Sequence, residues 1–88
     1  MMGNEGPPPA GELTELRLCA NEWSYWLVLV YREVESGDIQ LFYPYPTVRR
    51  GTRGFARRLA ELRAKGRRWS KMTRTPYRED DLWPGDEL

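Results

Sequence analysis

The pattern of apolar and polar positions predicts a half-buried strand near the start of the chain. In Leu13–Ala20, apolar Leu16 and Leu18 fall on one face, and charged Glu15 and Arg17 fall on the other. Such alternation is typical of a strand that has one side against a core and the other in water. A turn at the following Asn-Glu pair would let the next segment pair back antiparallel.

The next two segments have the pattern of a β-hairpin. Tyr25–Val34 is rich in Val, Tyr and Trp, the residues that favour strands. Ser36 and Gly37 then predict a two-residue loop, with Gly37 at a positive φ, leading into a strand over Asp38–Tyr43. The prolines of the Tyr-Pro-Tyr-Pro stretch end the pairing, because proline has no N–H to donate to a neighbouring strand.

An amphipathic helix is predicted over Arg53–Lys65. Thr52 precedes it as a candidate N-cap, and Gly66 stands where a left-handed residue commonly ends a helix. Arg67–Thr75 alternates loosely and indicates a possible short strand, which Pro76 would end. Three apolar residues at i, i+4 and i+7 of the helix would face the core: Phe55, Leu59 and Leu62.

These elements define a small α+β protein. We expect a three-stranded antiparallel sheet (a meander) with one C-terminal helix packed on one face, and a possible fourth short strand after the helix. At 88 residues the chain has room for one domain with a small core. The expected organisation is a disordered leader over 1–12, a single domain over 13–76 and an acidic, aromatic tail over 77–88.

The predicted hairpin is apolar on both faces, and a single helix cannot cover both. If the loop has two residues, Val34 pairs with Ile39. One face then collects Val28, Val30, Val34, Ile39, Leu41 and Tyr43. The other face is the candidate partner-binding surface, made of Tyr25, Leu27, Leu29, Tyr31 and Phe42. The uncovered face could be closed by Tyr77 and Trp83 of the tail, by a second copy of the chain, by a protein partner or by stacked bases.

Charge is strongly segregated along the chain. The span 48–78 holds twelve basic residues and one acid, Glu61, whereas the segments on both sides are net acidic, and the formal net charge is only +1. A basic block of this kind either faces a polyanion or is neutralised by acids of its own chain. The acids of 79–88 could do the latter by folding over the helix as a shield.

The charge pattern favours a nucleic-acid-binding accessory or regulatory protein that uses the basic helix and its flanks. The guanidinium group of arginine matches phosphate oxygens well. The candidate nucleic-acid-binding residues are Arg49, Arg50, Arg53, Arg57, Arg58, Arg67, Arg68, Lys71 and Arg74. The alternative is a small phage-type inhibitor or modulator. It would bind a protein through the apolar sheet face, or an acidic protein surface through the basic helix. DNA and RNA both remain open as partners, and so does a homodimer.

The residue types argue against catalysis, metal binding and cofactor binding. The chain has no His, and Cys19 is its single cysteine, so one chain cannot form a Cys/His zinc site or a disulfide. Gly51 and Gly54 match neither the P-loop nor the dinucleotide-binding fingerprint. We therefore expect a non-enzymatic protein without cofactor or metal.

Composition also bears on location and source. No apolar run approaches the ~20 residues that span a bilayer, and the start of the chain lacks the basic and apolar regions of a signal peptide. We expect a cytoplasmic protein with no membrane partner. Arginine outnumbers lysine twelve to two, a bias that a GC-rich coding sequence produces, which indicates a GC-rich bacterium or its phage.

Overall fold

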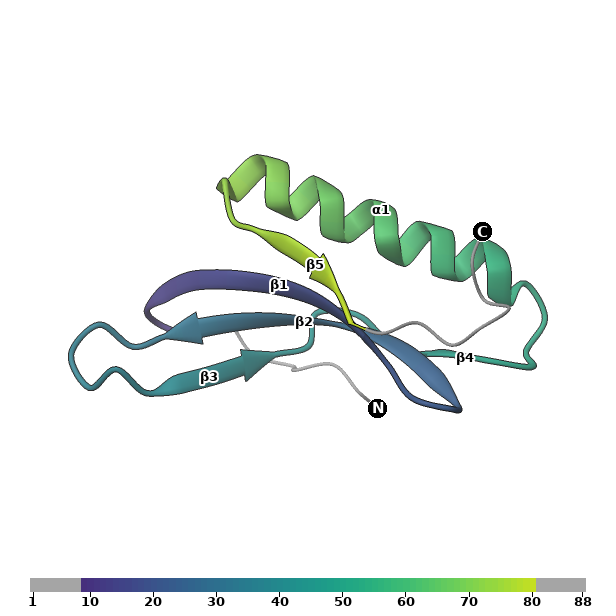
Figure 1. The fold of residues 1–88 in the computed structure, drawn as a ribbon, viewed down its shortest axis with the longest axis horizontal. Helices are drawn as coiled ribbons and strands as arrows, with labels where there is room; N and C mark the ends of the chain where they lie inside the picture. The colour runs from purple at the N-terminus through teal and green to yellow at the C-terminus, as the bar shows by residue number, and fades with distance from the viewer. Residues whose placement is uncertain (1–8, 81–88) are drawn as a thin grey trace.

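A computed structural model describes residues 9–80 and shows two layers, an open β-sheet and one helix across one of its faces (Figure 1). The elements are β1 (Glu12–Ala20), β2 (Ser24–Arg32), β3 (Ile39–Phe42), β4 (Val48–Arg49), α1 (Phe55–Thr73) and β5 (Tyr77–Glu79). The α+β class and the single C-terminal helix are as predicted. The sheet has five strands rather than three.

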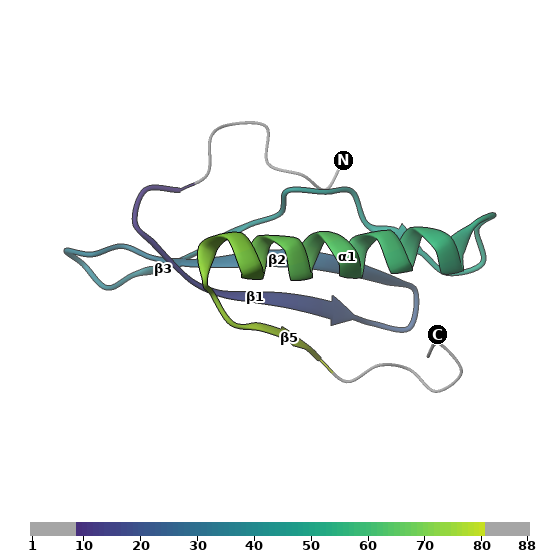
Figure 2. The same cartoon turned by 90° about the horizontal axis from the view of Figure 1, so that it is seen from above.

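β2 is the central strand of this sheet. The strand order is β3-β2-β1-β5, and the short β4 also pairs with β2. The β1/β2 and β2/β3 pairs are antiparallel, but β5 is parallel to β1, so the sheet is mixed rather than a simple meander. Seen from above (Figure 2), α1 runs along β1 and β2, and β5 lies beside β1.

The loop between β2 and β3 is longer than the predicted two residues. The Glu33 N–H donates to the Asp38 carbonyl at 2.9 Å, and it is Arg32, not Val34, that pairs with Ile39. The register therefore differs from the prediction by two residues. Because side chains alternate with a period of two, this slip leaves the paired side chains of β2 and β3 on their predicted faces.

The core lies between α1 and the sheet face below it. β1 contributes Leu16 and Leu18, and α1 contributes Leu59 and Leu62, with Phe55 packed at the edge, all as the periodicity predicted. The remaining large core side chains of β2 and β3, at most 8% exposed, are Tyr25, Leu27, Leu29, Tyr31 and Phe42. These are the five residues expected to bind a partner. That expectation is corrected, because all five are buried in the core.

α1 is longer than the predicted helix because Gly66 lies inside it. The helix spans Phe55–Thr73, so most of Arg67–Thr75, the segment predicted as a fourth strand, is helical. Gly66 is buried against the ring of Tyr77, and a Cβ added to it would lie 2.5 Å from Cε1 of that ring. The glycine therefore permits close packing between the helix and Tyr77. The strand that follows the helix is Tyr77–Glu79 rather than the predicted Arg67–Thr75.

Both ends of α1 differ from the predicted caps. Gly54 occupies the N-cap position without a side-chain cap, while Thr52 Oγ1 donates to the Arg49 carbonyl at 2.6 Å. At the C-terminal end Arg74 is left-handed, with φ 56° and ψ 40°, where glycine is usual. Thr52 is therefore not the N-cap, and Arg74 rather than Gly66 ends the helix.

β5 joins the start of the predicted tail to the domain. The Leu16 N–H donates to the Pro76 carbonyl and the Asp80 N–H donates to the Leu18 carbonyl, both at 2.9 Å. The domain therefore extends through β5, beyond the boundary predicted at residue 76. Most of the predicted leader (1–8) and the rest of the tail (81–88), with Trp83, lie outside the described residues.

A polar cluster fastens β5 to the helix. Arg63, only 8% exposed, donates from Nε to Oε2 of Glu79 at 3.2 Å. The Tyr77 hydroxyl donates to the same oxygen at 2.8 Å. Burial, and after it the neighbouring carboxylate, raise the pKa of Tyr77, so this hydroxyl keeps its proton. Each polar group of the cluster thus has a partner inside the domain.

Candidate nucleic-acid interface

α1 presents its polar side to solvent. Its leucines face the sheet, so residues three or four positions apart on the opposite side form one outward line. The exposed residues of α1, which make up its outer face, are Ala56, Arg57, Ala60, Glu61, Ala64, Arg67, Arg68, Lys71, Met72 and Thr73. Arg53, just before the helix, and Arg74, just after it, are exposed as well. The structure thus exposes six of the nine predicted nucleic-acid-binding residues on one helix and its immediate ends.

The exposed cations of this outer face repel one another, and few acidic groups offset that repulsion. None of the six exposed cations forms an ion pair with another residue of the described span 9–80. Arg67 and Arg68 lie four and three residues before Lys71, and such like-charged pairs destabilise a helix by about 0.2–0.5 kcal/mol each. The one acid within α1 is Glu61. An external anion would relieve this repulsion.

The remaining three predicted residues lie around the start of the helix. Arg49, in β4, is exposed and adds to the basic surface. Arg58 is half-buried and donates to Thr52 Oγ1. Arg50 donates to the Asn21 carbonyl, and its guanidinium carbon lies 4.8 Å from the ring centroid of Tyr25. Arg50 therefore supports the fold and is poorly placed to reach a phosphate.

Two further cations of the helix have structural partners. Arg63 is held by Glu79, as described above. The Lys65 ammonium lies 4.5 Å from the ring centroid of Tyr45, whose hydroxyl accepts a hydrogen bond from Trp69 Nε1 at 2.9 Å. The helical pattern places both cations beside the apolar stripe, but their partners come from segments distant in sequence, which periodicity does not predict.

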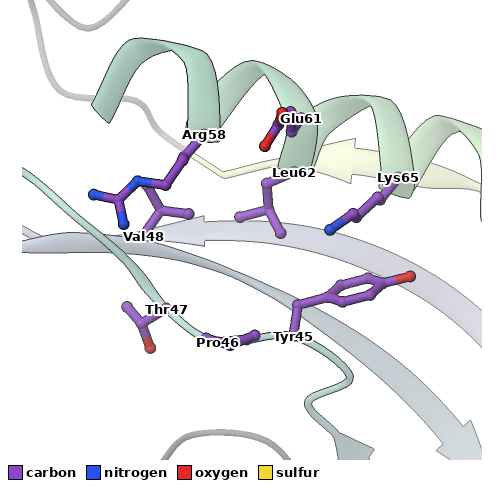
Figure 3. Close-up of a pocket in the computed structure, with 8 residues that line it drawn as sticks. All are labelled: Tyr45, Pro46, Thr47, Val48, Arg58, Glu61, Leu62 and Lys65. Carbon is purple, nitrogen blue, oxygen red and sulfur yellow. The ribbon is translucent and has the colours of Figure 1, made fainter. Parts of the chain in front are cut away.

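A small cavity of about 210 Å³ opens between α1 and the segment before β4 (Figure 3). Arg58, Glu61 and Lys65 line it from the helix, and Tyr45 and Thr47 line it from the opposite side. Ligand pockets usually exceed ~300 Å³. Arg58 Nε is buried without a hydrogen-bond partner among the described residues, whereas the Thr47 hydroxyl points away from the helix (Figure 3). The cavity is therefore small and offers few polar groups to a ligand.

The sheet face away from the helix carries exposed apolar side chains. Ile39 is 58% exposed, Leu41 is 46% exposed, and Val34 in the adjacent loop is 78% exposed. Val28, on the same face of β2, is only 4% exposed. If the protein binds a protein partner through its sheet, the sheet face away from the helix is the surface available for that contact.

Two classes of feature are absent from the described residues. Across 9–80 no three Cys, Asp or Glu residues gather closely enough to hold a metal ion. The same span has no helix that is long and apolar enough to cross a membrane.

Comparison with known proteins adds no relative. No model of a protein family matches this chain. Neither a curated protein nor a solved structure is significantly similar to it.

Proposed function

We propose that this protein is a non-enzymatic, nucleic-acid-binding accessory or regulatory protein that binds phosphates through the outer face of α1 and its flanks. The observation that carries the proposal is the set of six exposed cations without described acidic partners: Arg53, Arg57, Arg67, Arg68, Lys71 and Arg74. The nucleic-acid backbone is a polyanion, and each phosphate that a protein neutralises releases counterions.

Shape and charge support the same surface. Leu59 and Leu62 pack the helix against the sheet, so the opposite side of the helix faces solvent. Arginines in fixed positions suit bidentate contacts with phosphate oxygens. A flexible basic tail would carry the same charge, but its arginines would have no fixed positions relative to one another.

The test is the salt dependence of binding to a fluorescent duplex or single strand of about 20 nucleotides. With six phosphate contacts, affinity should fall by about a thousandfold between roughly 50 and 200 mM salt. The double variant Arg67→Gln/Arg68→Gln should lower the slope of log affinity against log salt by about 1.8, since each phosphate contact contributes about 0.9 for duplex DNA.

A matched control removes two arginines from the opposite layer. Arg32→Gln/Arg78→Gln takes the same charge from exposed positions of β2 and β5, and it should leave the slope unchanged. Equal effects of the two double variants would contradict the assignment to the helix. If no salt-sensitive binding occurs, the protein-binding alternative is favoured, through the exposed Val34, Ile39 and Leu41.

A further inference from the structure

We propose that the nucleic acid is duplex DNA and that the outer face of α1 lies in its major groove. This inference rests on the proposed function and adds the substrate class and the mode of binding. It depends on how the cations are spaced along the helix, on what covers the helix, and on which side chains accompany the cations.

The cations form two groups separated along one rigid helix. Arg53 and Arg57 lie at its N-terminal end, and Arg67, Arg68 and Lys71 lie towards its C-terminal end. At 1.5 Å per residue, Arg57 and Lys71 are about 21 Å apart along the helix axis. The major groove is about 12 Å wide and has a phosphate backbone on each side. A helix that crosses this groove obliquely places one group at each backbone.

The middle of the outer face carries small side chains at two of its three exposed positions. These positions are Ala60, Glu61 and Ala64, and a Glu carboxylate can accept a hydrogen bond from the amino group of cytosine in the major groove. An ordinary helix with its side chains is about 10–12 Å across, which already fits the groove. With alanines at the centre, the helix backbone can approach the base edges closely while the longer arginines reach the phosphates.

The helix is also accessible. It forms one of the two layers by itself, with the sheet behind it and no other element of the described residues over its outer face (Figures 1 and 2). A helix covered on two sides could not enter a groove about 8.5 Å deep.

The same face lacks what other nucleic acids require. Proteins that bind single strands stack bases on aromatic side chains, and the exposed residues of the outer face include no aromatic one. The helix's own aromatic residues, Phe55 and Trp69, pack against the core instead. Duplex RNA has a deep, narrow major groove that does not admit a helix. Duplex DNA is therefore the form that fits.

The experiment compares four polyanions at about 0.1 M salt: duplex DNA of roughly 20 base pairs, its single strand, duplex RNA of the same sequence, and heparin. The wild-type protein should bind duplex DNA most tightly of the three nucleic acids. Ala64→Leu changes no charge and keeps a strong helix former. It should weaken duplex DNA binding about tenfold, the effect of losing roughly one phosphate contact, and leave heparin binding unchanged because heparin has no groove.

Two variants make this result interpretable. Ala60→Leu repeats the test one turn earlier, in case Ala64→Leu impairs folding as judged by thermal melting. Gln40→Leu adds an exposed leucine to β3, a strand that α1 does not contact, and should change no affinity.

Three outcomes would overturn the inference and leave the proposed function standing. They are tighter binding of single strands or duplex RNA, unchanged duplex DNA affinity in both leucine variants, and an equal loss of heparin affinity. A wild-type protein that binds none of the three nucleic acids would overturn both the inference and the function.

Discussion

At the scale of single residues, the contact between Gly66 of α1 and the ring of Tyr77 sets how closely the last strand approaches the helix. A glycine inside a helix costs about 1 kcal/mol relative to alanine. Here that cost permits a contact that any Cβ would prevent, because the added atom would lie 2.5 Å from the tyrosine ring.

Gly66→Ala should therefore destabilise the protein by about 1–3 kcal/mol, since overpacking outweighs the gain in helix propensity. In a Tyr77→Ala background the ring is gone, and the same Gly66→Ala change should instead stabilise the helix by up to about 1 kcal/mol. Urea denaturation of the four proteins measures both effects. An equal cost in both backgrounds would show that Gly66 acts through its backbone conformation.

Two half-buried acids of raised pKa make the protein sensitive to alkali. Burial, followed by the hydrogen bond and charge of Asp80, raises the pKa of the Cys19 thiol from 9.0 to about 12. Burial likewise raises the pKa of Tyr77 above its ordinary value of 10.0. Both groups hold their protons more tightly in the folded state. Their contribution to stability is therefore complete below the unfolded pKa values and is lost as the pH rises through the folded ones.

The urea midpoint should accordingly stay level up to about pH 8 and fall steadily from about pH 9 upward. The fall should be shallower in the double variant Cys19→Ala/Tyr77→Phe, which removes both ionisable groups. A fall of the same steepness in wild type and variant would assign the alkaline transition to other groups.

At this scale the sequence predicts what depends on local spacing. The alternation in β1 identifies Leu16 and Leu18 as core residues, and helical spacing does the same for Leu59 and Leu62. The role of Gly66 could not be predicted, because Tyr77 lies eleven residues further along the chain and meets it only after the chain reverses at Arg74.

At the scale of elements, the end of α1 depends on one residue in an unfavourable conformation. Arg74 adopts φ 56°, a left-handed conformation that costs a residue with a Cβ roughly 1–2 kcal/mol. Glycine normally occupies this position. The sequence predicts that the helix ends at Gly66, but the helix continues past this glycine and ends at Arg74. Capping preferences do not identify an arginine as the end of a helix.

Arg74→Gly should raise the free energy of unfolding by about 1 kcal/mol. It should also lower the affinity for nucleic acid, because one phosphate contact is lost. Arg74→Ala separates the two effects, because it removes the charge and keeps the strained conformation. It should weaken binding equally without gaining stability. Thermal melts and salt titrations of both variants test this, and a destabilised Arg74→Gly protein would contradict the strain at this position.

At the scale of the whole molecule, the sequence could not decide which sheet face the helix covers. Both faces of the β2/β3 hairpin are apolar, so hydrophobic pattern gives no preference. The structure places the larger side chains, Tyr25 and Tyr31 among them, under the helix and leaves Ile39 and Leu41 exposed. The choice follows from how well side chains of distant elements fill the space between the layers.

Whole-molecule organisation also separates the two surfaces available for binding. α1 lies over one face of the sheet (Figure 1). The strand register places the exposed side chains of Ile39 and Leu41 on the other face. A nucleic-acid partner and a protein partner would therefore contact different layers of the molecule.

Because the two surfaces are separate, a map of the bound surface distinguishes nucleic-acid binding by the helix from binding by the sheet. In a ¹H–¹⁵N NMR titration with a short DNA duplex, we expect the largest shift changes on the amides of Arg57, Ala60, Ala64, Arg67 and Lys71. The amides of Ile39 and Leu41 should barely move. Shift changes concentrated on β3 and its loop, with the helix unaffected, would contradict the assignment of nucleic-acid binding to the outer face of α1.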